Sequence, residues 1–129
     1  MVIPVPIGTR ATVQRVVEFK HTLKAVHEPL PPVLSTPSMI GLMEYACYEA
    51  TLDFCEADEI TVGTHINVSH RAPCGIGNVV VAEAVLEKID GRFHIFRVTA
   101  KHDGRLLGEG HVHRAFVSVG KFMQKQGLK

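Results

Sequence analysis

The stretch that decides the fold is Leu34-Ser35-Thr36-Pro37-Ser38-Met39-Ile40-Gly41-Leu42-Met43-Glu44-Tyr45-Ala46-Cys47. It begins as helices begin: Ser35 or Thr36 can cap the first turn, and Pro37 suits the first helical position, where its missing N–H would have no partner. The pattern predicts a helix from about Pro37 to about Cys55. Its apolar side chains point in nearly every direction around the axis, which predicts a buried helix.

One carboxylate, that of Glu44, lies in the middle of this apolar helix. Desolvating an unpaired carboxylate is costly, so Glu44 needs a partner, a raised pKa or a catalytic task. The simpler interpretation is a glutamate that reaches out of the helix or pairs with a strand residue. The residues alone support both interpretations about equally, because buried ionisable groups mark functional sites only statistically.

Length and composition predict one globular domain spanning residues 1–129, with 46% hydrophobic and 21% charged residues. A net charge of +1 favours neither nucleic-acid nor membrane-surface binding. No apolar run reaches the ~20 residues that span a bilayer. The first ten residues lack the layout of a signal peptide, and the 3 cysteines form an odd set without metal-like spacing. We therefore expect reduced thiols and a cytoplasmic location.

On both sides of the helix the hydrophobic pattern has a period of two, which is typical of strands. One strand is expected at Ala11–Phe19, followed by a His21–Leu34 loop, and four more are expected after the helix, at residues 60–70, 78–89, 92–102 and 106–119. Asp90-Gly91 and Asp103-Gly104 indicate type I′ hairpins. We expect an α+β fold in which a curved antiparallel sheet wraps around one buried helix. Its open edges favour pairing into a homodimer.

Four sequence blocks follow one another across roughly residues 34–122: Thr36-Pro-Ser-Met-Ile-Gly-Leu-Met-Glu44-Tyr-Ala-Cys47, Val62-Gly63-Thr64-His65-Ile-Asn-Val-Ser-His70, His102-Asp103-Gly104 and Gly108-Glu-Gly110-His111-Val-His113-Arg114-Ala115. In this order, beside an apolar helix with a central acid, they resemble the fluoroacetyl-CoA thioesterase-like family of the hotdog fold. The resemblance implies an acyl-CoA thioesterase that acts as a homodimer. Coenzyme A would enter as part of the substrate, with no other cofactor, and pairing of dimers into tetramers stays open.

The resemblance assigns the catalytic roles to Thr36, Glu44 and His70, and substrate binding to Gly63 and Arg114. The backbone N–H of Gly63 would help to hold the thioester carbonyl. Each residue also has a structural interpretation: Thr36 as part of a helix cap, His70 as a polar strand end, and Gly63 as a bulge.

Helix geometry constrains how this site can be assembled. Eight residues of an ideal helix rise by about 12 Å, so Thr36 and Glu44 cannot touch along one straight helix. Either the chain folds back before Pro37, or the two side chains come from different subunits. We expect a site at a dimer interface.

Two other functions are weighed against the thioesterase. A hotdog hydratase or dehydratase would characteristically show a paired Asp and His beside the helix start, which this chain lacks. A non-catalytic acyl-thioester-binding dimer is the third interpretation. A metal site is not expected: His111 and His113 share one side of a strand, but no carboxylate or cysteine at useful spacing completes a ligand set.

The acyl group is expected to be short, because the buried helix leaves little room for a tunnel. In the family, the fluoroacetate-specific member closes its entrance with phenylalanines in the stretch that corresponds to residues 21–33. This chain has no phenylalanine there, so a preference for fluoroacetyl-CoA does not follow from the resemblance. Of the basic residues that could contact coenzyme A phosphates, Arg71, Arg114 and Lys121, only Arg114 is supported by the resemblance.

Overall fold

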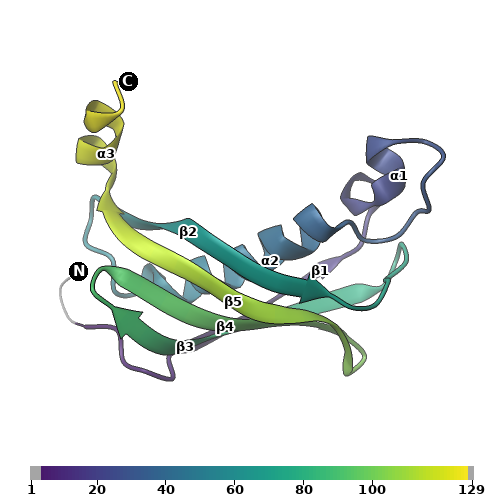
Figure 1. Cartoon of the computed structure of the whole chain (residues 1–129), viewed down its shortest axis with the longest axis horizontal. Helices are drawn as coiled ribbons and strands as arrows, with labels where there is room; N and C mark the ends of the chain where they lie inside the picture. The colour runs from purple at the N-terminus through teal and green to yellow at the C-terminus, as the bar shows by residue number, and fades with distance from the viewer. Residues whose placement is uncertain (1–3, 128–129) are drawn as a thin grey trace.

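A single antiparallel sheet of five strands, in the order β1-β3-β4-β5-β2, forms the body of the molecule. The computed structural model describes residues 4–127. The elements follow in the order β1 (Arg10–Val16), η1 (Phe19–His21), α1 (Leu23–Val26), α2 (Thr36–Leu52), β2 (Glu59–His70), β3 (Val79–Asp90), β4 (Phe93–His102), β5 (Arg105–Ser118) and α3 (Val119–Lys125). Figure 1 shows the long, curved strands crossing α2, with α1 and α3 projecting at opposite ends.

Helix α2 begins where the sequence predicts. Ser35 caps it, since the Ser35 Oγ accepts a hydrogen bond from the Ser38 N–H at 3.2 Å, and Pro37 lies in the first turn. The helix ends at Leu52, three residues earlier than expected, because the N–H groups of Phe54 and Cys55 bond to carbonyls three residues back. The prediction of the helix is thus confirmed, except at its C-terminal end.

The core lies between one side of α2 and the sheet. The apolar side chains that face each other there are Met39, Leu42, Met43, Ala46 and Cys47 from α2, and Ala82, Ala84, Leu86, Phe96, Val98 and Ala100 from the strands. Tyr45 and Leu52, in contrast, are 46% and 42% exposed. The expectation of burial on all sides is therefore wrong for one chain, because the sheet covers only one side of the helix.

The strands agree with the predicted pattern with small shifts. β1 ends at Val16 rather than at Phe19, because the chain turns there into the short helices η1 and α1, which the sequence did not indicate. After β5, the chain forms the seven-residue helix α3.

Both predicted hairpins are present. Asp103 and Gly104 have positive φ, as a type I′ turn requires. In the first hairpin the loop is Gly91-Arg92 rather than Asp90-Gly91, because Asp90 pairs with Phe93. Only Gly91 has positive φ there, which fits type II′.

Strand β2 lies at the edge of the sheet, and its outer side has no strand partner among the described residues. Its register against β5 shifts between Gly63 and His65, so the bulge expected at Gly63 is present. Residues 63–67 are exposed. None of the helices within residues 4–127 has the length and apolar character needed to cross a bilayer.

Candidate active site

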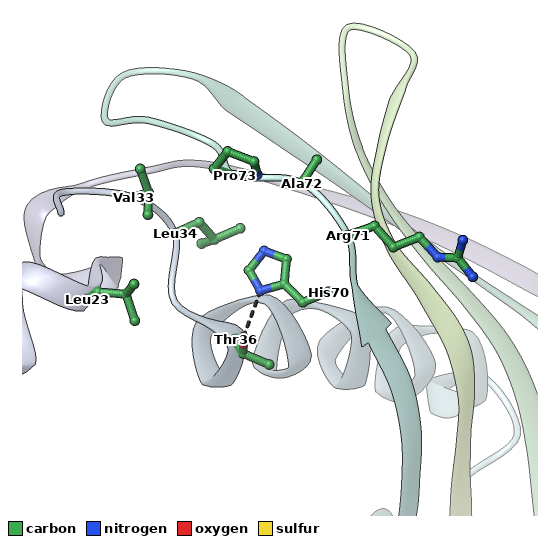
Figure 2. A pocket seen from close by; sticks show the side chains of 8 residues that line it. All are labelled: Leu23, Val33, Leu34, Thr36, His70, Arg71, Ala72 and Pro73. Atoms are coloured by element: carbon green, nitrogen blue, oxygen red, sulfur yellow. Dashed lines mark hydrogen bonds between the residues drawn. The ribbon is translucent and has the colours of Figure 1, made fainter. Parts of the chain in front are cut away.

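Thr36 and His70 meet at the start of α2. The helix begins at Thr36 and β2 ends at His70, so the two elements bring together residues that are 34 positions apart. The Thr36 Oγ1 and the His70 Nδ1 are 2.7 Å apart, and Figure 2 shows this bond as a dashed line. The pair can pass a proton from the hydroxyl to the imidazole, which would activate the hydroxyl or a water beside it.

A cavity of about 250 Å³ surrounds this pair. Its other lining residues are mostly apolar: Leu23, Val33, Leu34, Arg71, Ala72 and Pro73. In Figure 2 the second ring nitrogen of His70 points away from Thr36. That nitrogen, Nε2, is buried and has no hydrogen-bond partner in the described chain. We call this space the Thr36–His70 pocket; it combines an apolar lining with one proton-transfer pair.

Glu44 belongs to a second cluster, near the middle of α2. The Glu44 Oε2 accepts a hydrogen bond from the Arg114 Nη1 at 3.1 Å, so the mid-helix carboxylate has an ionic partner. Arg114 is itself held by Thr61, whose carbonyl accepts from the Arg114 Nη2 at 2.6 Å. A Cβ at Gly63 would lie 2.5 Å from the Glu44 Oε2, so only glycine lets the carboxylate lie against β2. The predicted residues Glu44, Gly63 and Arg114 thus form one cluster.

The electrostatics of this second cluster follow from burial. The Arg114 side chain is 7% exposed and that of Glu44 is 34% exposed. Burial lowers the pKa of the Arg114 guanidinium from its usual value, and the nearby Glu44 carboxylate counteracts this. The Arg114 guanidinium is therefore hydrogen-bonded to Glu44 and Thr61 inside the protein rather than exposed at the surface. Cys47, on the same helix, has its pKa raised by burial to about 12, so its thiol stays protonated at neutral pH.

The two clusters lie apart on one chain. Thr36 and Glu44 are both in α2, which is continuous from Thr36 to Leu52, so they are separated by about 12 Å of helical rise. The chain does not fold back between them. Within one subunit the structure therefore pairs Thr36 with His70, and Glu44 with Gly63 and Arg114, and does not join the two groups.

Three other histidines make contacts on the sheet, away from the Thr36–His70 pair. The rings of His65 and His113 lie 4.6 Å apart on the sheet, and the His111 Nε2 is 2.9 Å from the Glu87 Oε1. Within residues 4–127, no three histidine, cysteine, aspartate or glutamate side chains lie close enough to hold a metal ion.

Sequence reasoning missed two contributors to the site. Thr61 orients Arg114, but nothing in the alternating pattern of β2 distinguishes it from other polar strand positions. Leu23 comes from α1, a four-residue helix too short to leave a periodic signal. Only the fold brings α1 beside the end of β2.

Comparison with known proteins gives a consistent result. The model of the fluoroacetyl-CoA-specific thioesterase family matches residues 6–120. A fluoroacetyl-CoA thioesterase from Streptantibioticus cattleyicolor is 40% identical over 96 residues, which are 74% of this chain and 68% of that protein. A solved structure of a fluoroacetyl-CoA thioesterase is 31% identical, covers 97% of both chains and has a TM-score of 0.89. A hot-dog-like protein from Thermanaerovibrio acidaminovorans, 19% identical with a TM-score of 0.86, covers 95% of this chain and 90% of its own, and confirms the hotdog fold.

Proposed function

The chain belongs to the fluoroacetyl-CoA-specific thioesterase family, and we propose that it hydrolyses a short-chain acyl-CoA thioester at a site shared by two copies of the chain. Water enters, and the free acid and coenzyme A leave. The observation that carries the proposal is the pairing of Thr36 with His70 at 2.7 Å beside an apolar cavity, with an anchored carboxylate elsewhere on the same helix.

A shared site follows from the separation of the two clusters. A thioester carbonyl is small, so groups about 12 Å apart along α2 cannot all reach it. A second copy of the chain would place its own Glu44 cluster opposite the Thr36–His70 pair. The same arrangement would occur twice in a two-fold dimer.

The exposed edge of β2 is the surface suited to this pairing. It has no strand partner on its outer side within the described residues, and residues 63–67 are exposed. Gly63 and His70 lie at equal distances on either side of a point between Ile66 and Asn67. Antiparallel pairing of two β2 edges about that point would therefore place Gly63 opposite His70 of the partner subunit.

Each group of the shared site has a proposed role in thioester hydrolysis. The N–H of Gly63 would donate to the carbonyl oxygen as negative charge develops on it. The Thr36–His70 pair would donate a proton to the leaving thiolate and take one from the attacking water. Glu44, oriented by Arg114, would attack the carbonyl or hold the attacking water. In the first route an acyl-enzyme forms and water then releases it, whereas in the second route water attacks directly.

The lining of the Thr36–His70 pocket suggests the substrate class. Its lining by Leu23, Val33, Leu34 and Pro73 is aliphatic, and its volume of about 250 Å³ suits a short acyl chain. Among the described residues, no phenylalanine, tyrosine or tryptophan lines it. A short aliphatic acyl group is therefore the substrate we propose, with fluoroacetyl-CoA as a comparison substrate.

The test is thiol release from a panel of acyl-CoA esters: acetyl, fluoroacetyl, butyryl, isobutyryl, aromatic and long-chain. For the substrate that turns over, Glu44→Gln and His70→Ala should each lower kcat by about 10²–10⁴-fold. Glu49→Gln, on the same helix but outside both clusters, is the matched control and should keep the wild-type rate. Absence of turnover on the whole panel, or an unchanged rate in Glu44→Gln, would overturn the proposal. Hydration of an enoyl-CoA would then favour a hydratase.

A further inference from the structure

His21 is a buried titratable side chain to which the proposed reaction assigns no role. It ends the short helix η1 and is 8% exposed. Beside it lies a cavity of about 10 Å³, which is no larger than one water molecule needs. Apart from His21, Arg15 is the one titratable residue in the described lining of this cavity, which is otherwise mostly apolar. The His21 ring therefore lies in a small space that can hydrate a charge only poorly.

One hydrogen bond of the His21 ring defines its protonation state. The Glu18 N–H donates to the His21 Nδ1 at 2.9 Å. A backbone N–H can only donate, so Nδ1 is the acceptor and the ring is neutral, with its proton on Nε2. In the imidazolium both ring nitrogens carry a proton, and the Nδ1–H would face the Glu18 N–H. Protonation of His21 therefore replaces this hydrogen bond with a contact between two donors.

The charged groups around His21 also act against its protonation. Burial, and next the positive charge of Arg15, lower the pKa of His21, and Lys20 adds to this effect. The Glu18 carboxylate acts in the opposite direction without reversing it. The side chains that α2 and β3 add to the lining of the small cavity are uncharged: Ser38, Leu42 and Val80. The closed structure is therefore built for the neutral form of His21.

The backbone at His21 supports one wall of the Thr36–His70 pocket. The His21 carbonyl accepts a hydrogen bond at 2.9 Å from the N–H of Ser35, which caps α2 directly before Thr36. The next residue, Thr22, pairs with Leu34 in an antiparallel bridge. Leu34 lines both the small cavity beside His21 and the Thr36–His70 pocket. A change at His21 can therefore reach the pocket through Leu34 and Ser35.

Residues 22–34 form a segment that depends on a few anchors. Residues 25–32 are exposed. The Leu23 N–H donates to the Val33 carbonyl at 3.0 Å, and the Leu34 N–H donates to the Cys74 carbonyl at 2.8 Å. Leu23, Val33 and Leu34 all line the Thr36–His70 pocket (Figure 2). Exposed segments with few buried contacts open more readily than the core, so the loss of one anchor should be felt here first.

We propose that neutral His21 is a positioning residue for the Thr36–His70 pocket, and that its protonation releases residues 22–34 from their closed position. His21 takes no part in the chemistry and acts through Ser35, Leu34 and Leu23. The effect on activity rests on the proposed function, whereas the release of the segment does not. Because the open segment binds a proton more readily than the closed one, acid favours opening, by up to about tenfold per pH unit below about pH 6.5.

Amide hydrogen exchange at about pH 7.5 and about pH 5 tests the release, with protection factors corrected for the intrinsic exchange rate at each pH. In the wild type, protection of the Leu23 and Leu34 amides should fall at least about fivefold on acidification, relative to amides in the middle of α2. In His21→Asn the side-chain oxygen can accept from the Glu18 N–H without titrating, so protection should be equal at both pH values. His27→Asn, which changes an exposed histidine of the same segment, is the matched control and should behave as the wild type.

Thiol release from acyl-CoA measures the consequence for the pocket. At neutral pH, His21→Ala should raise KM about 2–10-fold with kcat little changed, as expected for one lost hydrogen bond, and His21→Asn should keep the wild-type KM. A wild-type KM in His21→Ala would refute the positioning role.

Two results of the exchange measurement would overturn the inference: equal protection of the wild type at both pH values, or the same acid-induced loss in His21→Asn as in the wild type. If the wild type hydrolyses no thioester, the proposed function fails. The exchange measurement then still decides whether protonation of His21 releases residues 22–34, because it needs no substrate.

Discussion

A dimer that carries Thr36→Ala in one subunit and Glu44→Gln in the other is expected to keep about half of the wild-type activity. Each proposed site takes Thr36 and His70 from one subunit and Glu44 from the other. One site of this dimer then contains both substitutions, and the other contains neither. Co-expression with two different affinity tags and tandem purification isolates the mixed dimer, and thiol release from acyl-CoA measures its activity.

The matched control contains the same two substitutions in a different arrangement. Thr36→Ala and Glu44→Gln are placed together on one subunit, and the partner is wild type. Each of the two sites then contains one defect, so activity should fall by about 10²–10⁴-fold. The two dimers have the same overall composition, so differences in stability do not explain a difference in rate.

The opposite order of activities would refute the shared site. If one chain held a complete site, the dimer with both substitutions on one subunit would keep half of the activity, and the dimer with separated substitutions would be inactive. The prediction rests on the continuity of α2, which separates Thr36 from Glu44 by about 12 Å.

Three further predictions concern single positions. Gly63→Ala places a methyl group 2.5 Å from the Glu44 Oε2. Because the end of the Glu44 side chain can move away, kcat should fall at least about tenfold while the free energy of unfolding changes by less than about 1 kcal/mol. A wild-type kcat would contradict the role of this contact. Arg114→Met leaves the Glu44 carboxylate and the Thr61 carbonyl without their partner, so urea denaturation should show a loss of about 2–4 kcal/mol, which Glu44→Gln should partly restore. Burial lowers the pKa of His94 in the folded protein. Below about pH 6.5, His94 therefore binds a proton more readily in the unfolded chain than in the folded protein. Stability should therefore decrease as pH falls, and equal slopes for the wild type and His94→Phe in thermal melts would contradict this.

The local pattern of the sequence was a reliable guide to the elements. Ser35 and Pro37 mark the start of α2, and Asp103-Gly104 marks a tight turn, because capping and left-handed backbone depend on the residues in place. The end of α2 and the short helix α1 were missed, since they depend on contacts rather than on periodicity. The burial of α2 was overestimated, because apolar residues on a helix face do not show which part of the protein covers that face.

For the candidate site, the sequence by itself determined which side chains are available: a threonine at the start of the helix, a mid-helix carboxylate, a strand-end histidine and a glycine in a β-branched strand. Helical rise alone already required that Thr36 and Glu44 lie apart. Only the tertiary structure decided the partners. It joined Thr36 to His70 and Glu44 to Arg114, because residues far apart in the chain meet through the pairing of β2 with β5 and the packing of α2 on the sheet. Such contacts depend on the register between strands, which no single stretch of sequence records.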